Sequence, residues 1–225
     1  MADDFVFEHR RTDNARFERA QRFLTSFSAE LAGSPMGNLG FDVVDVGRTQ
    51  PSGKSCLVAG MVAAARGMRL FSGAFDTTVK QLMQKAREMG IVGAEGIPPT
   101  YAGNISELAA HLNLKSRVRY FYPNEMTPQE IRELAREISF GIGANSAVMA
   151  LIPSMRHWQL LNRLSSQGFS AFDTLFGTNT QRSIADVASG LGHIVNGEMV
   201  GERREGNAFI VLSEARDPSF IVNDW

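Results

Sequence analysis

The spacing of hydrophobic residues changes along the chain, from helical in the first half to strand-like in the second. In "DNARFERAQRFLTSFSAELAG" the apolar residues recur at near-helical spacing, at Phe17, Phe23, Leu24, Phe27 and Leu31. Later come short apolar runs that end at Pro, Gly or polar turns: "SAVMALIP", "HWQLLNRL", "GFSAFDT" and "NAFIVLSE". The close spacing of the first three predicts an antiparallel meander. The pattern therefore predicts an α+β fold, with a helix-rich N-terminal half packed on an antiparallel β-sheet from the C-terminal half.

Capping and stop signals bound several of the expected helices. "TPQE" at residues 127–130 combines a Thr N-cap, Pro at the first helical position and Glu at the capping-box position, so we expect a helix through "IRELAREIS". "DTTVKQLMQKAREMG" predicts a helix with Asp76 or Thr77 as N-cap and Gly90 as the stop. We also expect a strand in "FDVVDVG" at residues 41–47, a helix from Cys56 to about Met68, and a short helix in "NISELAAHLNL".

Composition narrows the function classes. The 225 residues include 23 basic and 24 acidic ones, for a net charge of -1, which argues against a nucleic-acid binder that depends on overall charge. No apolar run approaches the roughly 18 residues of a spanning helix, so we expect no stable membrane insertion. The N-terminal stretch lacks the apolar core of a secretory signal peptide, and we expect no Sec-type export. The single cysteine excludes an internal disulfide and a Cys-rich zinc site, and we expect no metal or other cofactor.

One segment, "QPSGKSC" at residues 50–56, lies between a strand-like run and an Ala-rich, helix-like one. Gly-Lys-Ser before a helix ends a phosphate-binding P-loop, but that loop needs four residues between its first Gly and this tripeptide. Here five residues follow Gly47, and Arg48 stands at the required position. A P-loop also alternates strands with helices, whereas the later strands are clustered here. A nucleotide-binding protein that uses "SGKS" is therefore the weaker interpretation.

The stronger interpretation is a thiol nucleophile at Cys56. A helix N-terminus stabilises a thiolate through its dipole and its free backbone N–H groups, and Cys56 lies where the helix should begin. Such a thiolate needs an imidazole as general acid–base and a carboxylate or amide to orient that imidazole. Of the four histidines, His9, His111 and His193 have simpler roles at the surface, in packing or near a helix end.

His157 differs because it opens the strand-like "HWQLLNRL", and Asp173 ends the next one, "GFSAFD", sixteen residues later. If these segments pair as a hairpin, the start of the first lies opposite the end of the second. The pairing predicts that His157 and Asp173 lie side by side, within hydrogen-bond reach, where the strands end at one edge of the sheet.

The order Gln50, Cys56, His157, Asp173 resembles the papain-like cysteine peptidase clan. "QPSGKSC" is similar to the Gln-x5-Cys start of that clan, and "HWQLLNRLSSQGFSAFDTLFG" looks most like the YopT/AvrPphB effector proteases. In those proteases the Asp lies in a Phe-Asp-Pro-Asn-Phe-Gly-like turn, whereas this chain has Thr and Leu in place of Pro and Asn. Bacteriocin-processing peptidases are about as similar around Cys56. The resemblance covers roughly residues 48–68 and 147–180.

The resemblance implies a papain-like catalytic domain over residues 37–225. The helical spacing of apolar residues predicts a separate N-terminal helical region, residues 1–36, that is either a docking or regulatory element or the first core helix. The resemblance implies Cys56 as nucleophile, His157 as acid–base, Asp173 as its orienting partner and Gln50 in the oxyanion hole. It also implies a bacterial effector or toxin that leaves the bacterial cytoplasm by a specialised secretion system and acts on a protein inside a host or target cell.

Other functions stay open at this point. The same four residues serve a transglutaminase, a deamidase or another acyltransferase, because the acceptor is chosen by the cleft. An inactive papain-like binding module is the rival from another class, and it predicts a sulfur far from His157 or a blocked cleft.

Overall fold

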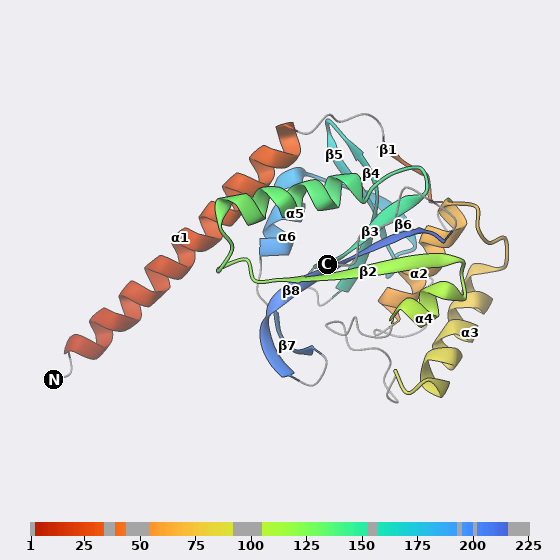
Figure 1. Ribbon diagram of the computed structural model, residues 1–225, viewed down its shortest axis with the longest axis horizontal. Helices are drawn as coiled ribbons and strands as arrows, with labels where there is room; N and C mark the ends of the chain where they lie inside the picture. The colour runs from red at the N-terminus through yellow and green to blue at the C-terminus, as the bar shows by residue number, and fades with distance from the viewer. Residues whose placement is uncertain are drawn as a thin grey trace.

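The computed structural model describes residues 3–33, 39–43, 55–91, 105–152, 157–192, 195–199 and 202–215. Within them the fold is α+β, with helices on both faces of one antiparallel sheet (Figure 1). The α+β class and the antiparallel sheet are therefore confirmed.

The sheet follows the order β2-β8-β3-β4-β5-β6. These strands are β2 (Leu114–Phe121), β8 (Glu202–Glu214), β3 (Ser146–Ile152), β4 (His157–Ser165), β5 (Gly168–Asp173) and β6 (Thr178–Arg182). Two short strands lie off this path: β1 (Leu39–Gly40) pairs with β4, and β7 (Val195–Met199) pairs with β8. The strands β3, β4 and β5 are neighbours in sequence and in the sheet, as the meander prediction requires.

Each face of the sheet carries its own hydrophobic core. Helices α2 (Cys56–Gly67), α3 (Phe75–Glu88) and α4 (Ile105–Ala110) share one core with Ala147, Met149 and Leu151 of β3. Helices α1 (Asp3–Gly33), α5 (Pro128–Phe140) and α6 (Ile184–Gly192) share the other with Val148 and Ala150. Because successive side chains of a strand point to opposite faces, β3 is buried on both sides. This explains its unbroken apolar sequence, "SAVMALI".

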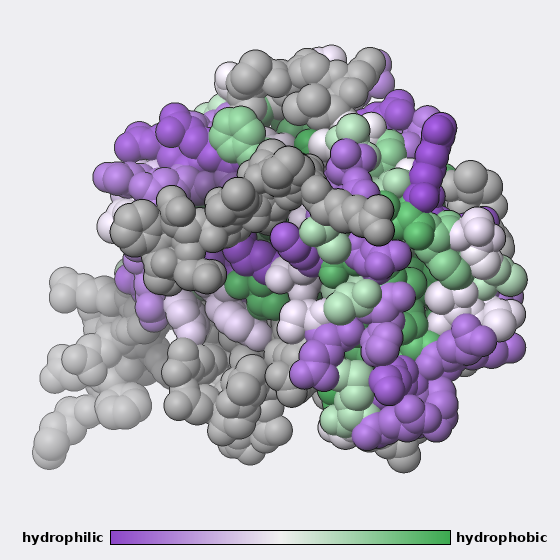
Figure 2. All heavy atoms as spheres, turned by 45° about the vertical axis from the view of Figure 1, so that its right-hand side comes forward, coloured by the Kyte–Doolittle hydropathy of each residue, from purple (hydrophilic) through white to green (hydrophobic). Residues whose placement is uncertain are grey.

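The outer surface of the α2, α3 and α4 layer is mixed in character. Helix α3 buries Val79 and Leu82, whereas its Lys80, Lys85 and Glu88 are exposed. On the face that Figure 2 draws, hydrophilic residues are interspersed with hydrophobic ones accordingly.

No helix in the described ranges is long and apolar enough to cross a membrane.

Helix α2 is the most deeply buried helix of the first core. Its sequence, "CLVAGMVAAARG", is buried without interruption from Cys56 to Ala65. Gly60 lets it approach the sheet closely, since a Cβ at that position would overlap the side chain of Met149. At the far end, Gly67 faces the ring of Phe41, whose backbone N–H bonds Asn162 O of β4 at 3.1 Å.

Helix α1 belongs in part to the second core. Phe23, Phe27 and Leu31 are fully buried, and the helix packs against α5 and α6, whereas Phe17 is 65% exposed. The N-terminal half of α1 extends away from the rest of the protein (Figure 1). Phe23, Phe27 and Leu31 therefore belong to the core, while a docking or regulatory role for residues 1–36 stays a prediction.

The helix N-termini predicted from capping residues are confirmed where the capping side chains make the expected hydrogen bonds. Thr127 Oγ1 accepts from the N–H of Glu130, and Glu130 Oε2 accepts from the N–H of Thr127 at 2.7 Å, so the capping box is confirmed. The predicted N-cap of α3 is wrong. The helix begins at Phe75 with Ala74 as N-cap, and Asp76 lies in the first turn, where its charge favours the helix dipole.

One strand prediction needs correction, and strand β2 was not predicted. In the predicted strand at residues 41–47, residues 41–43 form no strand, because the paired residues are Leu39 and Gly40; residues 44–47 lie outside the described ranges. The sequence reading also passed over β2, whose basic and apolar residues share the segment "LKSRVRYF".

Candidate active site

Cys56 is the first residue of α2, as predicted. The first helical bond runs from the N–H of Ala59 to Ser55 O at 2.9 Å, so the N-terminal turn of α2 starts at the candidate nucleophile. The first N–H groups of a helix have no partner within the helix, and the positive end of its dipole stabilises an anion there. Cys56 is also a free cysteine and only 1% exposed, in the same core cluster as Trp158.

His157 and Asp173 meet through the predicted hairpin. Strands β4 and β5 are antiparallel, with Gln159 directly opposite Asp173. His157 lies two positions before Gln159, so both project to the same side of β4. His157 Nε2 lies 3.0 Å from Asp173 Oδ1, and the two side chains are 7% and 2% exposed. The prediction that these two residues lie side by side is confirmed.

The carboxylate of Asp173 is held by three donors. Its Oδ1 accepts from His157 Nε2 and from the backbone N–H of Leu175, each at 3.0 Å, and its Oδ2 accepts from Gln159 Nε2 at 2.8 Å. Burial by itself would raise the pKa of Asp173, but the hydrogen bonds from His157, Leu175 and Gln159 outweigh burial and lower that pKa below its ordinary value. Asp173 is therefore ionised at neutral pH and orients its partners as an acceptor.

His157 links this carboxylate to the sulfur. Burial would lower the pKa of His157, but hydrogen bonds with Asp173 and with the Cys56 side chain outweigh burial and raise the pKa to about 9. Since an ionised carboxylate only accepts, Nε2 is the donor to Asp173. Nδ1 is then the ring nitrogen left for Cys56. The three side chains form a continuous chain from thiol to imidazole to carboxylate, and the imidazole is charged through neutral pH.

Gln159 belongs to this site, although the sequence pattern did not single it out. It is 1% exposed and approaches Asp173 from the side opposite to the bond with His157. A signal was present: a polar residue inside the apolar run "HWQLL", two positions after the candidate histidine, projects to the same side of a strand.

Two predicted features are not placed by the structure. Gln50 and the "SGK" of the phosphate-loop alternative fall outside the described residues, so the structure does not test the oxyanion hole or the nucleotide-binding loop. His111 is exposed. No group of three His, Cys, Asp or Glu residues suited to a metal ion occurs in the part of the chain that the structure describes.

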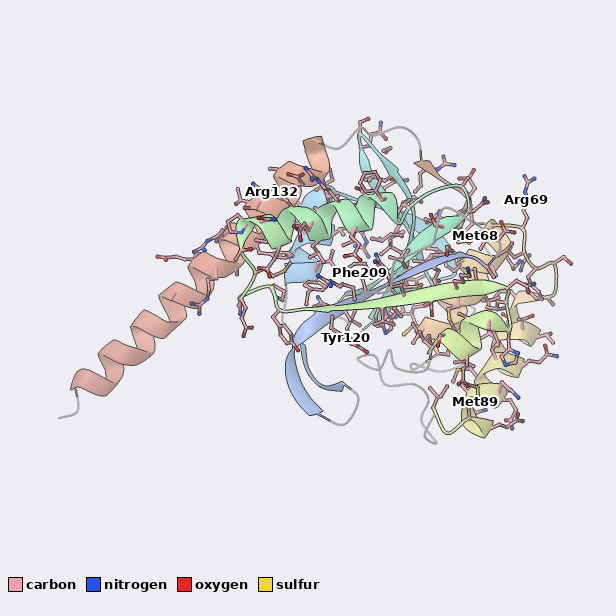
Figure 3. All side chains as sticks on the ribbon, in the orientation of Figure 1. Met68, Arg69, Met89, Tyr120, Arg132 and Phe209 are labelled. Carbon is pink, nitrogen blue, oxygen red and sulfur yellow. The ribbon has the colours of Figure 1, made fainter. Side chains whose placement is uncertain are left out.

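A cavity of about 320 Å³ lies at the opposite end of α2 from Cys56. Its lining includes Arg66, Arg69, Phe71 and Phe75, and Figure 3 shows Arg69 pointing outward from this end of the helix. Along an α-helix each residue rises about 1.5 Å, so Arg66 is roughly 15 Å from Cys56. The cavity is therefore separate from the Cys56–His157–Asp173 site.

Comparisons with known proteins give no relative. No family model, no curated protein and no solved structure matches the chain. The functional argument therefore depends on the geometry of the site itself.

Proposed function

We propose that this protein is a papain-like cysteine protease, similar to the YopT/AvrPphB effector proteases, that acts on a protein substrate inside a host or target cell. The observation that carries the proposal is the contact between Cys56, at a helix N-terminus, and an imidazole whose other nitrogen bonds a buried carboxylate. A thiol that serves only in packing needs none of these partners. The inactive-module alternative expects the sulfur far from His157, whereas Cys56 lies close enough to raise the pKa of that imidazole, which argues against the alternative.

The reaction begins with the thiolate of Cys56 and the imidazolium of His157 as an ion pair. The sulfur attacks the carbonyl carbon of the scissile peptide, an S–C bond forms, and the carbonyl electron pair moves onto oxygen. The Cys56 backbone N–H and, by resemblance, the Gln50 side-chain amide hold this oxyanion. One such donor contributes about 3 kcal/mol of transition-state stabilisation.

Proton transfer by His157 completes both halves of the reaction. The imidazolium donates its Nδ1 proton to the leaving amine as the C–N bond breaks, which leaves a thioester and a neutral imidazole. The imidazole then takes a proton from water while the water oxygen attacks the thioester, the C–S bond breaks, and the ion pair is restored. Asp173 stays ionised throughout and stabilises the imidazolium from the Nε2 side.

The ring nitrogens have the opposite roles to those in chymotrypsin-type serine proteases. There Nε2 faces the nucleophile and Nδ1 bonds the aspartate, whereas here Nε2 bonds Asp173. His157 is the first residue of β4, and Asp173 is the last residue of the neighbouring strand β5. The arrangement supports a triad assembled from one helix and two strands.

The first test is alkylation of Cys56 by iodoacetamide between pH 4 and pH 9, followed by intact mass. The single cysteine makes the mass shift unambiguous. Because Cys56 is 1% exposed, labelling is slow at every pH, so the shape of the pH profile is compared rather than the absolute rate. An ion pair gives a labelling rate that, relative to its value at pH 9, has already reached its plateau at pH 5–6.

His157→Ala is the decisive variant, and His111→Ala, at an exposed histidine, is its matched control. We expect Cys56 in His157→Ala to be labelled much more slowly at pH 5–6 than at pH 9, and His111→Ala to keep the wild-type profile. An ordinary thiol profile in the wild type, unchanged by His157→Ala, would refute the protease and leave Cys56 as a core residue.

A peptide mixture then separates hydrolysis from the other reactions of the same triad. New peptide termini that disappear with Cys56→Ala identify a protease. Conversion of glutamine to glutamate identifies a deamidase, and addition of a supplied primary amine identifies a transglutaminase. If either of these two products forms without new peptide termini, the proposed proteolysis is contradicted, but the assignment of Cys56, His157 and Asp173 as a triad is still supported.

A further inference from the structure

The turn that follows Asp173 exposes two adjacent apolar side chains beside the candidate active site. Leu175 is 41% exposed and Phe176 is 55% exposed, and among the described residues the other large exposed apolar side chains are Phe17 and Phe140. Phe17 and Phe140 stand alone on helices, so the pair in this turn forms the denser apolar surface.

The same carboxylate that binds His157 fixes the geometry of this turn. The N–H of Leu175 and His157 Nε2 each lie 3.0 Å from Asp173 Oδ1, and the N–H of Gly177 bonds Asp173 O at 2.7 Å. Gly177 has φ +66°, in the left-handed region that glycine adopts without strain. The position of Leu175 and Phe176 is therefore coupled to the position of the imidazole.

The turn also packs against the helix face that carries Cys56. Thr174 is fully buried, and its Cγ2 lies 3.9 Å from where a Cβ on Gly60 would be. Gly60 is four residues after Cys56, so both lie on one face of α2. The turn that carries the apolar pair therefore lies against the N-terminal half of α2, the helix that begins at Cys56.

The stretch of chain on either side of the pair is suited to an apolar group. Residues 168–181 contain a single charged residue, Asp173, whose carboxylate is buried and engaged by its three donors. Exposed apolar side chains that are clustered rather than scattered mark a binding surface. An acidic or basic group from a ligand would find no countercharge from this stretch of chain.

We propose that Leu175 and Phe176 form a subsite that binds an apolar side chain of the polypeptide substrate next to the scissile bond. The inference deepens the proposed protease function and rests on it. The subsite predicts that the enzyme prefers substrates with Leu, Phe or a similar apolar residue near the scissile bond over substrates with Asp or Lys there.

The test uses tripeptidyl chloromethyl ketones that differ in one side chain, Leu, Phe, Asp or Lys, at each position in turn. The Cys56 sulfur displaces chloride from the reagent, an S–C bond forms, the C–Cl bond breaks, and intact mass reports the rate. The readout is the ratio of the apolar-probe rate to the Asp-probe rate within each variant. Any change in the ion pair affects both rates equally and leaves the ratio unchanged.

We expect wild type to favour Leu or Phe at one position by about tenfold, the usual worth of a small apolar contact in a specificity site. Phe176→Ser should abolish this preference. Phe140→Ser is the matched control: it removes a side chain that is 77% exposed at the end of α5, near the start of β3, whereas His157 pairs with Ile152 at the end of β3. Its ratio should equal that of wild type.

Two failures are distinguishable. If iodoacetamide labelling depends on His157 but wild type shows no apolar preference, or Phe176→Ser keeps it, the subsite is overturned and the protease stands. If iodoacetamide labelling is independent of His157, the proposed function is overturned and the subsite with it.

Discussion

Replacing Gln159 with leucine should destabilise the protein through the charge on Asp173. The hydrogen bond from Gln159 Nε2 to Asp173 Oδ2 is 2.8 Å long, and both residues are 1% exposed. Leucine is similar in volume, so the change removes a donor and creates little empty space. A buried hydrogen bond to a charged acceptor contributes about 1.5–3 kcal/mol. We expect the free energy of unfolding to fall by about 2 kcal/mol, which lowers Tm by about 4–8 °C in a chain of this size.

The loss of unfolding free energy in Gln159→Leu should depend on pH, whereas a loss caused by poorer packing alone would not. The pKa of Asp173 is lowered in the folded protein, partly by Gln159. A carboxylate with a lowered pKa stabilises the fold above its unfolded pKa, 3.8 here, and that stability disappears as the pH falls through the folded pKa. The difference between wild type and Gln159→Leu should therefore be large at pH 7 and shrink below about pH 4.

Urea unfolding at a series of pH values measures both quantities, and iodoacetamide labelling at pH 6 reports the orientation of His157 in the same samples. Gln159→Glu is the matched control, because at neutral pH it places a second carboxylate against Asp173. That variant should be less stable than wild type at pH 7 and recover in acid, where its protonated carboxyl donates to Asp173. A Gln159→Leu loss below about 0.5 kcal/mol, or one that is the same at pH 7 and in acid well below the unfolded pKa of 3.8, would refute this reasoning.

Two further predictions concern the imidazole and a helix end remote from the site. The pKa of His157 is about 9, so its imidazolium, and the stability and acid catalysis that it supplies, should persist through neutral pH and be lost as the pH rises through about 9. Asp173→Asn should move this titration, followed by NMR of the imidazole, to lower pH; an unchanged titration would show that Asp173 does not set it. Thr127→Ala removes the N-cap of α5 and should cost about 1 kcal/mol, or roughly 2–4 °C in Tm, with thiol reactivity unchanged. A change in thiol reactivity would instead connect α5 to the site.

The sequence predicted those parts of the site that depend on near neighbours along the chain. Cys56 begins a helix because a polar turn is followed by an uninterrupted helix-forming segment. His157 and Asp173 meet because two strands joined by a short turn have little choice but to pair in antiparallel fashion. Gln159 follows from the same pairing, and alternation along β4 would have revealed it.

The sequence did not predict which distant elements become neighbours. Strand β8, near the C-terminus, lies between β2 and β3 rather than at an edge. Different helices pack on the two faces of the sheet, and the C-terminal half of α1 contributes to the core that it shares with α5 and α6. The spacing of apolar residues predicts that a helix has an apolar face. Many faces in the chain are equally apolar, so which sheet face or helix a given helix packs against is decided by the packing of the complete core.

The sequence by itself therefore determined the α+β class, the helix start at Cys56 and the hairpin that joins His157 to Asp173. Only the tertiary structure decided that α2 lies along β4, beginning beside His157 and ending near Phe41, so that the thiol meets the imidazole. The physical reason is that hydrogen-bonded turns and strand pairing act between residues close in sequence. The contact of Cys56 with His157 depends instead on how α2 packs against the sheet. That packing involves the small side chains of α2, the contact of Met149 with Gly60, and the burial of α2 from Cys56 to Ala65.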